Sequence, residues 1–281
     1  MEILVIDRES LTNQLISSKL GAKGHHVTAE PNKNTAFELL AAKRFDCVMI
    51  DPAPLSEARP VIIGIWKALK GAYKPYLLLL SKGATTEDAI LAGTNDVLIK
   101  PLSSQELDEK IGNASRILDI GQMLAREDNV HSTGGMIGKA AFNQLFLSAT
   151  DRAFRYGERS LIVFVTLVNH AALQASVAPA DFGDVMETLA RQMTFMRRQS
   201  DVIGRLGDDD FAILLQRPQY ESEPIDAINR FAEVLDKFCA DYKAGPVKPE
   251  IHLRLIELPQ GAQHAERFVP QSAAAATATE V

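Results

Sequence analysis

An arginine and an aspartate three residues apart, Arg198 and Asp201, precede an acidic turn at Gly207–Asp210. The guanidinium fork of an arginine can donate two hydrogen bonds to a guanine edge, and a carboxylate can accept from the guanine N–H groups. Carboxylates grouped in a turn also supply the oxygen ligands that divalent cations prefer. Apolar runs at residues 201–206 and 211–215 flank the turn, which predicts a β-hairpin. The residue types alone do not distinguish such a site from a salt bridge at a helix-to-strand junction.

Four polar residues, Asp7, Asp51, Ser81 and Lys100, follow buried strand-like runs in the N-terminal part of the chain. Sites in doubly wound sheets form where the carboxyl ends of the parallel strands meet. Two carboxylates, a hydroxyl and an ammonium at that edge can hold a divalent ion and a phosphoryl group. Polar residues commonly follow strands, which explains any one of these residues, but the set of four together predicts a site.

Alternating strand-like and helix-like apolar patterns in residues 1–120 position these four residues. The alternation predicts an α/β fold with a doubly wound, five-stranded parallel sheet of the flavodoxin type. The expected strands are Glu2–Ile6, His26–Ala29, Cys47–Ile50, Tyr76–Leu80 and Asp96–Ile99. The expected helices are Leu11–Leu20, Thr35–Ala42, Val61–Leu69, Thr86–Ala92 and a last one capped by Ser103 or Ser104.

The last of these helices continues to about Leu124, and a polar stretch follows it. We therefore expect a first domain at residues 1–120, a helical linker at 121–132 and a second α/β domain at 133–258. Residues 259–281 contain few large apolar side chains, which predicts a disordered tail.

The composition is that of a soluble globular protein, with 46% hydrophobic and 23% charged residues. No apolar run has membrane-spanning length, and the net charge of −6 gives no basis for nucleic-acid binding. Cys47 and Cys239 lie singly in apolar segments, which indicates a reducing compartment. Since the chain begins on a strand-like run and not on a signal peptide, we expect a cytoplasmic protein with neither a membrane nor a nucleic acid as partner.

Residues 1–120 resemble the receiver domains of response regulators. The resemblance implies that Asp51 is the phosphoacceptor and that Ser81 and Lys100 sense the phosphoryl group, with a cis-like kink at Pro101. It also implies a magnesium site at Asp7 and Asp51, and a histidine kinase as a partner.

Arg8 departs from the receiver pattern, because the family has a second metal-binding carboxylate at this position. A cationic side chain there repels magnesium and can pair with Asp51 instead. The sequence therefore predicts the receiver fold but leaves magnesium binding, and phosphorylation of Asp51 by a kinase, open.

Residues 133–257 resemble GGDEF domains, the diguanylate cyclase family. The signature position is occupied by Gly207, Asp208, Asp209, Asp210 and Phe211. Gly135–Phe142 resembles the opening motif of the family, and Leu161–Val168 resembles its central strand. The resemblance implies a C-terminal α/β domain of the cyclase-palm type.

Two positions depart from what cyclase catalysis requires. Two magnesium ions must bridge the triphosphate, and Thr166 replaces the family's metal-binding carboxylate on the central strand. Asp208 replaces a glycine that lets the backbone approach the phosphates, and it adds a negative charge beside them. We therefore predict an inactive cyclase. The acidic Asp209 and Asp210 keep a weak diguanylate cyclase as an alternative.

Arg198 and Asp201 match the RxxD motif of the family's inhibitory site, at the family's spacing from the hairpin. The resemblance implies that both bind cyclic di-GMP, with Arg230 from the following helix as a third contact or Arg197 in its place. A salt bridge at a helix-to-strand junction would give the same spacing.

These patterns predict a bacterial signalling protein, a catalytically inactive GGDEF-type effector that binds cyclic di-GMP and acts through a protein partner. A nucleotide-free scaffold of a two-component pathway is a further alternative. Ile111, Leu118 and Met123 form an apolar stripe on the long helix. The stripe predicts either a homodimer seam or packing on its own domain.

Overall fold

The computed structural model describes residues 1–69, 74–126, 135–198, 200–216 and 223–270, and the chain forms two compact units. Unit 1 is Met1–Gly121 together with two later segments, Thr150–Glu158 and Pro259–Gly261. Unit 2 contains Gln122–Ala149, Arg159–Leu258 and the residues from Ala262 onward. Each unit is built around a sheet of its own.

Unit 1 contains a five-stranded parallel sheet with the strand order β2-β1-β3-β4-β5. The strands are β1 (Glu2–Ile6), β2 (His26–Ala29), β3 (Cys47–Ile50), β4 (Tyr76–Ser81) and β5 (Asp96–Ile99). The central strands are runs of buried apolar residues, because a parallel sheet is covered on both faces. The order and the parallel pairing confirm the predicted doubly wound α/β fold of the flavodoxin type.

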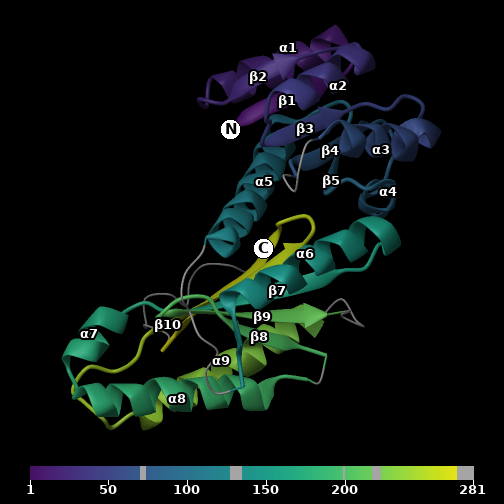
Figure 1. The fold of residues 1–281 in the computed structure, drawn as a ribbon. Coiled ribbons are helices and arrows are strands. Elements are labelled where there is room, and N and C mark those ends of the chain that lie inside the picture. Colours follow the sequence, from purple (N-terminus) through teal and green to yellow (C-terminus); the bar gives the residue numbers. More distant parts are fainter. Residues whose placement is uncertain (70–73, 127–134, 199, 217–222, 271–281) are drawn as a thin grey trace. The chain divides into compact units, whose positions relative to one another are not determined.

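Helices cover both faces of this sheet (Figure 1). They are α1 (Ser10–Gly21), α2 (Lys33–Ala42), α3 (Ala58–Ala68), α4 (Thr86–Ala92) and α5 (Ser104–Ala125), with a short 3₁₀ helix η1 (Leu55–Glu57) before α3. Ile16 of α1 and Leu107 of α5 share one buried cluster, whereas Leu40 of α2 and Ile62 of α3 belong to the cluster on the other face.

The long helix α5 begins where a serine caps it. The Ser103 hydroxyl accepts a hydrogen bond from the Glu106 N–H at 3.0 Å, so Ser103 is the capping residue of the two that the sequence offered. The helix continues to Ala125 and therefore includes the start of the predicted linker, while residues 127–132 lie outside the described part of the chain.

Unit 2 contains a six-stranded sheet with the order β11-β10-β7-β9-β8-β6. The strands are β6 (Ile137–Gly138), β7 (Ser160–Leu167), β8 (Val202–Arg205), β9 (Asp210–Gln216), β10 (Ile251–Leu258) and β11 (Gln263–Val269). β8 and β9 pair antiparallel, which confirms the predicted hairpin. β7 lies at the centre and pairs antiparallel with β9 and with β10.

The helices of unit 2 are α6 (Lys139–Tyr156), α7 (His170–Ala175), α8 (Pro179–Met196) and α9 (Glu223–Asp241). α8 and α9 cover one face of the sheet, where Leu189 and Phe231 share a core with Val163 of β7 (Figure 1). α6 packs on the other face, where its Phe142 lies against Gly204 of β8. Among the described residues, no helix is long and apolar enough to cross a membrane.

The prediction of a disordered tail from residue 259 is wrong for the residues up to 270. Residues Gln263–Val269 form the edge strand β11, which pairs antiparallel with β10 from Ile251 to Ile256. Its side chains alternate between exposed and covered positions, so the strand is held mainly by main-chain hydrogen bonds and carries little apolar signal. Residues 271–281 lie outside the described part of the chain.

We expect Gly204→Ala to destabilise unit 2 by about 1–3 kcal/mol, because a Cβ at this position would lie 2.5 Å from Cδ2 of the buried Phe142. Urea denaturation of the full chain measures the change.

Gly183→Ala is the matched control, since residue 183 lies within α8 and a Cβ there meets no atom within 4 Å. This change should stabilise the chain by up to about 1 kcal/mol, because alanine favours the helix. A Gly204→Ala protein as stable as the wild type would contradict the packing of α6 on β8.

Candidate functional site

The four polar residues predicted at the strand ends of unit 1 all lie at the carboxyl edge of its sheet. Asp7 follows β1, Asp51 follows β3, Ser81 ends β4 and Lys100 follows β5. The peptide bond between Lys100 and Pro101 is cis, as the sequence predicted. The edge therefore carries the charged groups that the sequence pattern assigned to it.

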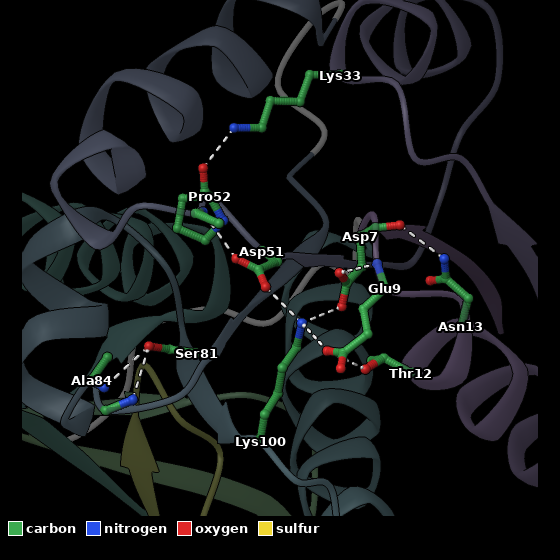
Figure 2. Close-up of polar contacts among 12 residues, drawn as sticks. Asp7, Glu9, Thr12, Asn13, Lys33, Asp51, Pro52, Ser81, Ala84 and Lys100 are labelled. Carbon is green, nitrogen blue, oxygen red and sulfur yellow. Dashed lines mark hydrogen bonds and ion pairs between the residues drawn. The ribbon is translucent and has the colours of Figure 1, made fainter.

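Lys100 is the centre of this cluster (Figure 2). Its Nζ lies 2.5 Å from Asp7 Oδ2, 2.6 Å from Asp51 Oδ2 and 3.2 Å from Glu9 Oε2. Burial of the ammonium lowers the pKa of Lys100, but the hydrogen bonds that it donates to the carboxylates outweigh burial and raise the pKa above its ordinary value. Lys100 is therefore a fixed positive charge in a largely buried acidic site.

Glu9 is a member of the cluster that the sequence analysis missed. The Glu9 N–H donates to Asp7 Oδ1 at 2.9 Å, and its carboxylate accepts from the Thr12 hydroxyl at 3.1 Å. Hydrogen bonding to Lys100 is the main reason that the pKa of the Glu9 carboxyl is lowered. An acidic residue two positions after Asp7, just before the first helix, was the available signal.

The expected pairing of Arg8 with Asp51 does not occur. Arg8 is exposed, and no ion pair joins it to Asp51 among the described residues. Asp51 pairs with Lys100 instead, while its Oδ1 accepts from the Ala53 N–H at 2.9 Å. The chain bends at Arg8, so that Asp7 and Glu9 both reach Lys100 while the Arg8 side chain is exposed.

Ser81 is positioned at the edge but stands apart from the ion-pair cluster (Figure 2). Its hydroxyl accepts hydrogen bonds from the N–H groups of Gly83 and Ala84, at 3.3 and 3.1 Å, and so holds the loop before α4. On the neighbouring loop, Lys33 of α2 donates to the carbonyl of Pro52 at 2.6 Å. The loop after Asp51 is thus fixed by a side chain from another helix, which the sequence analysis did not identify.

The arrangement of donors in this cluster does not match a magnesium site. A metal needs several oxygens converging on one point, whereas here Asp7, Glu9 and Asp51 converge on the Lys100 ammonium. Across the part of the chain that the structure describes, no three His, Cys, Asp or Glu side chains are grouped as metal ligands. Asp7 and Asp51 would have to leave Lys100 to bind the ion.

In unit 2, the register of the sheet places Thr166 of β7 directly opposite Asp210 of β9. The Thr166 hydroxyl donates to Asp210 Oδ1 at 2.7 Å. A threonine can donate this bond to a carboxylate, but it brings no negative charge to a metal. Thr166, at the family's central-strand metal position, is therefore hydrogen-bonded to Asp210, one of the two acidic turn residues that keep the weak cyclase as an alternative.

The turn between β8 and β9 is closed by main-chain hydrogen bonds and by an arginine. The Leu206 and Gly207 N–H groups both donate to the Asp210 carbonyl, at 2.8 and 3.1 Å. Arg205 donates from Nε to the Gly207 carbonyl at 3.0 Å, and its guanidinium lies 3.3 Å from the exposed carboxylate of Asp208. The negative charge that Asp208 adds to the signature is thus partly balanced within the hairpin.

Arg198 and Asp201 lie together immediately before β8. The Asp201 carboxylate accepts a hydrogen bond from the Arg198 N–H at 3.0 Å, and the Asp201 N–H donates to the Arg198 carbonyl, also at 3.0 Å. Asp201 is buried, whereas the side chain of Arg198 is exposed. The aspartate therefore fixes the main chain that presents the arginine.

Arg230, the predicted third contact, lies on α9 and lines a groove between α8 and α9. Its guanidinium is 5.6 Å from the ring of Phe231. Of the three predicted ligand residues, only Arg230 lines this groove. Arg197, the alternative, has its guanidinium 3.5 Å from the Asp201 carbonyl.

Comparison with known proteins shows two similarities. A stretch of 113 residues, 40% of this chain, is 26% identical to the two-component response regulator PhoP of Pseudomonas aeruginosa. The match includes 50% of PhoP, so the chain spans about half the length of this curated relative. A response-regulator structure from Clostridium difficile matches 42% of this chain and 98% of its own, with 17% identity and a TM-score of 0.36.

The second similarity is to the GGDEF domain of YfiN (TpbB) from Pseudomonas aeruginosa, with 20% identity and a TM-score of 0.38 over 48% of this chain and 76% of that chain. The family described as diguanylate cyclase, GGDEF domain, matches residues 134–278, which is more than half of the 281 residues. The chain therefore has a receiver-like N-terminal sheet and belongs to the GGDEF domain family.

Proposed function

We propose that this protein is a catalytically inactive GGDEF effector of a two-component pathway, which binds cyclic di-GMP through Arg198 and transmits the signal to a protein partner. The combination of a receiver-like sheet with a GGDEF domain supports the pathway. The partner, a histidine kinase upstream and the cytoplasmic location remain predictions from the sequence.

The observation that carries the loss of catalysis is the Thr166–Asp210 hydrogen bond. Diguanylate cyclases need carboxylates to hold two magnesium ions on the triphosphate, and here a neutral hydroxyl stands opposite Asp210. Asp208 adds a charge that repels phosphates, at a position where the family has glycine. Both features oppose binding of GTP with its metal ions.

Ligand binding is supported by the division of roles between the two RxxD residues. The exposed guanidinium of Arg198 can donate two hydrogen bonds to guanine O6 and N7. The buried Asp201 holds the Arg198 main chain, so the arginine is presented from a fixed turn. Pre-organisation of this kind lowers the entropic cost of binding. We therefore assign the direct contact to Arg198 and the positioning role to Asp201.

We expect Arg198→Ala to weaken cyclic di-GMP binding by roughly ten- to hundredfold, since a bidentate arginine–guanine contact contributes about 1–3 kcal/mol. Isothermal titration of the full chain measures this. Asp201→Asn should retain most of the affinity, because the asparagine oxygen can still accept from the Arg198 N–H.

Arg191→Ala is the matched control for that experiment, because Arg191 is an exposed arginine of α8 that forms an ion pair with Glu187 on the same helix. It should bind like the wild type. Equal losses in Asp201→Asn and Arg198→Ala would assign Asp201 to the ligand itself. A folded wild type that binds no cyclic di-GMP would contradict the effector function and leave the nucleotide-free scaffold.

We expect Thr166→Asp to lower the thermal midpoint in the presence of a chelator, because two carboxylates would face each other at the β7–β9 pair. Magnesium or manganese should raise the midpoint again, since a metal bound only by the folded state stabilises it. Thermal denaturation with and without metal measures both effects.

The wild type controls for this experiment, because it carries the same N-terminal acidic cluster. An equal metal-dependent rise in both proteins would contradict the assignment of Thr166. Incubation of the wild type with GTP and magnesium should give no cyclic di-GMP by chromatography, and formation of product would establish the weak cyclase in place of the effector.

We expect Lys100→Met to destabilise the protein by about 3–5 kcal/mol, because it leaves the buried Asp7 without its cation. Magnesium should recover part of the loss by taking the place of the ammonium. Lys43→Met removes a lysine from an exposed pair with Glu2 and should cost less than about 1 kcal/mol. Similar losses in the two variants would contradict the central role of Lys100.

A further inference from the structure

The groove between α8 and α9 is a surface of unit 2 that the proposed function does not use. It has a volume of about 750 Å³ and runs along both helices, from Asp181 to Met196 on α8 and from Arg230 to Asp241 on α9. The two helices run antiparallel, because each returns along the sheet after β7 or β9, and these strands are antiparallel. Asp184, in the first half of α8, and Lys237, in the second half of α9, therefore lie toward the same end of the groove, opposite to Phe195 and Arg230.

The surface has an apolar centre and an exposed aromatic anchor. Val185, Val234 and Phe238 line the groove, and Phe195 at its edge is 90% exposed. Exposed aromatic residues beside an apolar groove are typical of binding surfaces, and buried aromatic residues dominate the binding energy of many interfaces. Tyr242 also lines the groove, and its buried hydroxyl has no hydrogen-bond partner among the described residues.

The charges of the groove are divided between the two helices. The α8 side contributes Asp181 and Asp184, a charge of −2. The α9 side, together with the residues that follow the helix, carries a charge of +2. It contributes three cations and one anion, which are Arg230, Lys237, Lys243 and Asp241. Asp184 and Lys237 form no ion pair within the described part of the chain. The two sides thus carry opposite and unpaired charges.

From this division of charge we propose that two copies of the chain dimerise through the groove, with α8 of one copy lying over α9 of the other. A twofold axis parallel to the helices places the α8 side of one copy over the α9 side of the other. It does not change the position of a residue along the helix direction. It therefore brings Asp184 of each copy to Lys237 of the other, and Phe195 of each copy to the end where Arg230 lies. A partner of one charge sign would instead face a like charge on one side of the groove.

Sedimentation velocity of the full chain over a range of concentrations tests the dimer. The wild type should show a reversible monomer–dimer equilibrium. Asp184→Lys and Lys237→Asp should each weaken dimerisation at least tenfold, because each creates two like-charge contacts across the twofold axis. The double variant Asp184→Lys/Lys237→Asp should dimerise again, since both contacts regain opposite charges.

An equimolar mixture of the two single variants provides an independent test, because only the heterodimer pairs opposite charges at both contacts. Glu187→Lys is the matched control, since it reverses a charge on α8 at a residue that does not line the groove, and it should leave the equilibrium unchanged. Phe195→Ser should weaken the dimer without any change of charge. A monomeric wild type, or a double variant no better than the single ones, would overturn the proposal.

Discussion

The antiparallel pairing of β7 with β9 is the constraint on which unit 2 depends. Both strands are buried along almost their whole length, and their register runs from Ser160–Gln216 to Thr166–Asp210. A shift by one residue would turn every core side chain to the opposite face, so the packing of α6 and of α8 and α9 fixes the register. That packing therefore also determines that Thr166 lies opposite Asp210 and that the acidic turn follows at the end of this strand pair.

The fold could be predicted where the side chains alone decide the structure. The strands of unit 1 are continuous apolar runs, such as Cys47–Ile50, and their observed bounds agree with the prediction to within one residue. The edge strand Gln263–Val269 could not be found in this way. It is bound to β10 by main-chain hydrogen bonds, which any residue except proline can form, and most of its side chains are polar and exposed or partly exposed.

The residue types predicted which side chains belong to the sites better than they predicted which groups those side chains contact. Asp7, Asp51 and Lys100 were identified because they follow buried strands, and they meet as expected. Glu9 was missed because the family pattern directed attention to the preceding position, whereas the extended backbone at residue 9 returns its side chain to the cluster. Which groups a charged residue contacts depends on backbone dihedral angles that a residue pattern does not specify.

The acidic sites of both units are satisfied by donors from the chain itself. In unit 1 an ammonium lies among carboxylates, and in unit 2 Thr166 and Arg205 interact with the carboxylates of the hairpin. A metal ion entering either site must therefore displace a protein donor, and its apparent affinity is reduced by the free energy of that contact. The guanidinium of Arg198 lies outside these acidic sites and is exposed, on a main chain that Asp201 holds in place. The proposed ligand brings its own hydrogen-bond acceptors and would contact this arginine without opening either acidic site, which is why the proposal places recognition here and not in the hairpin.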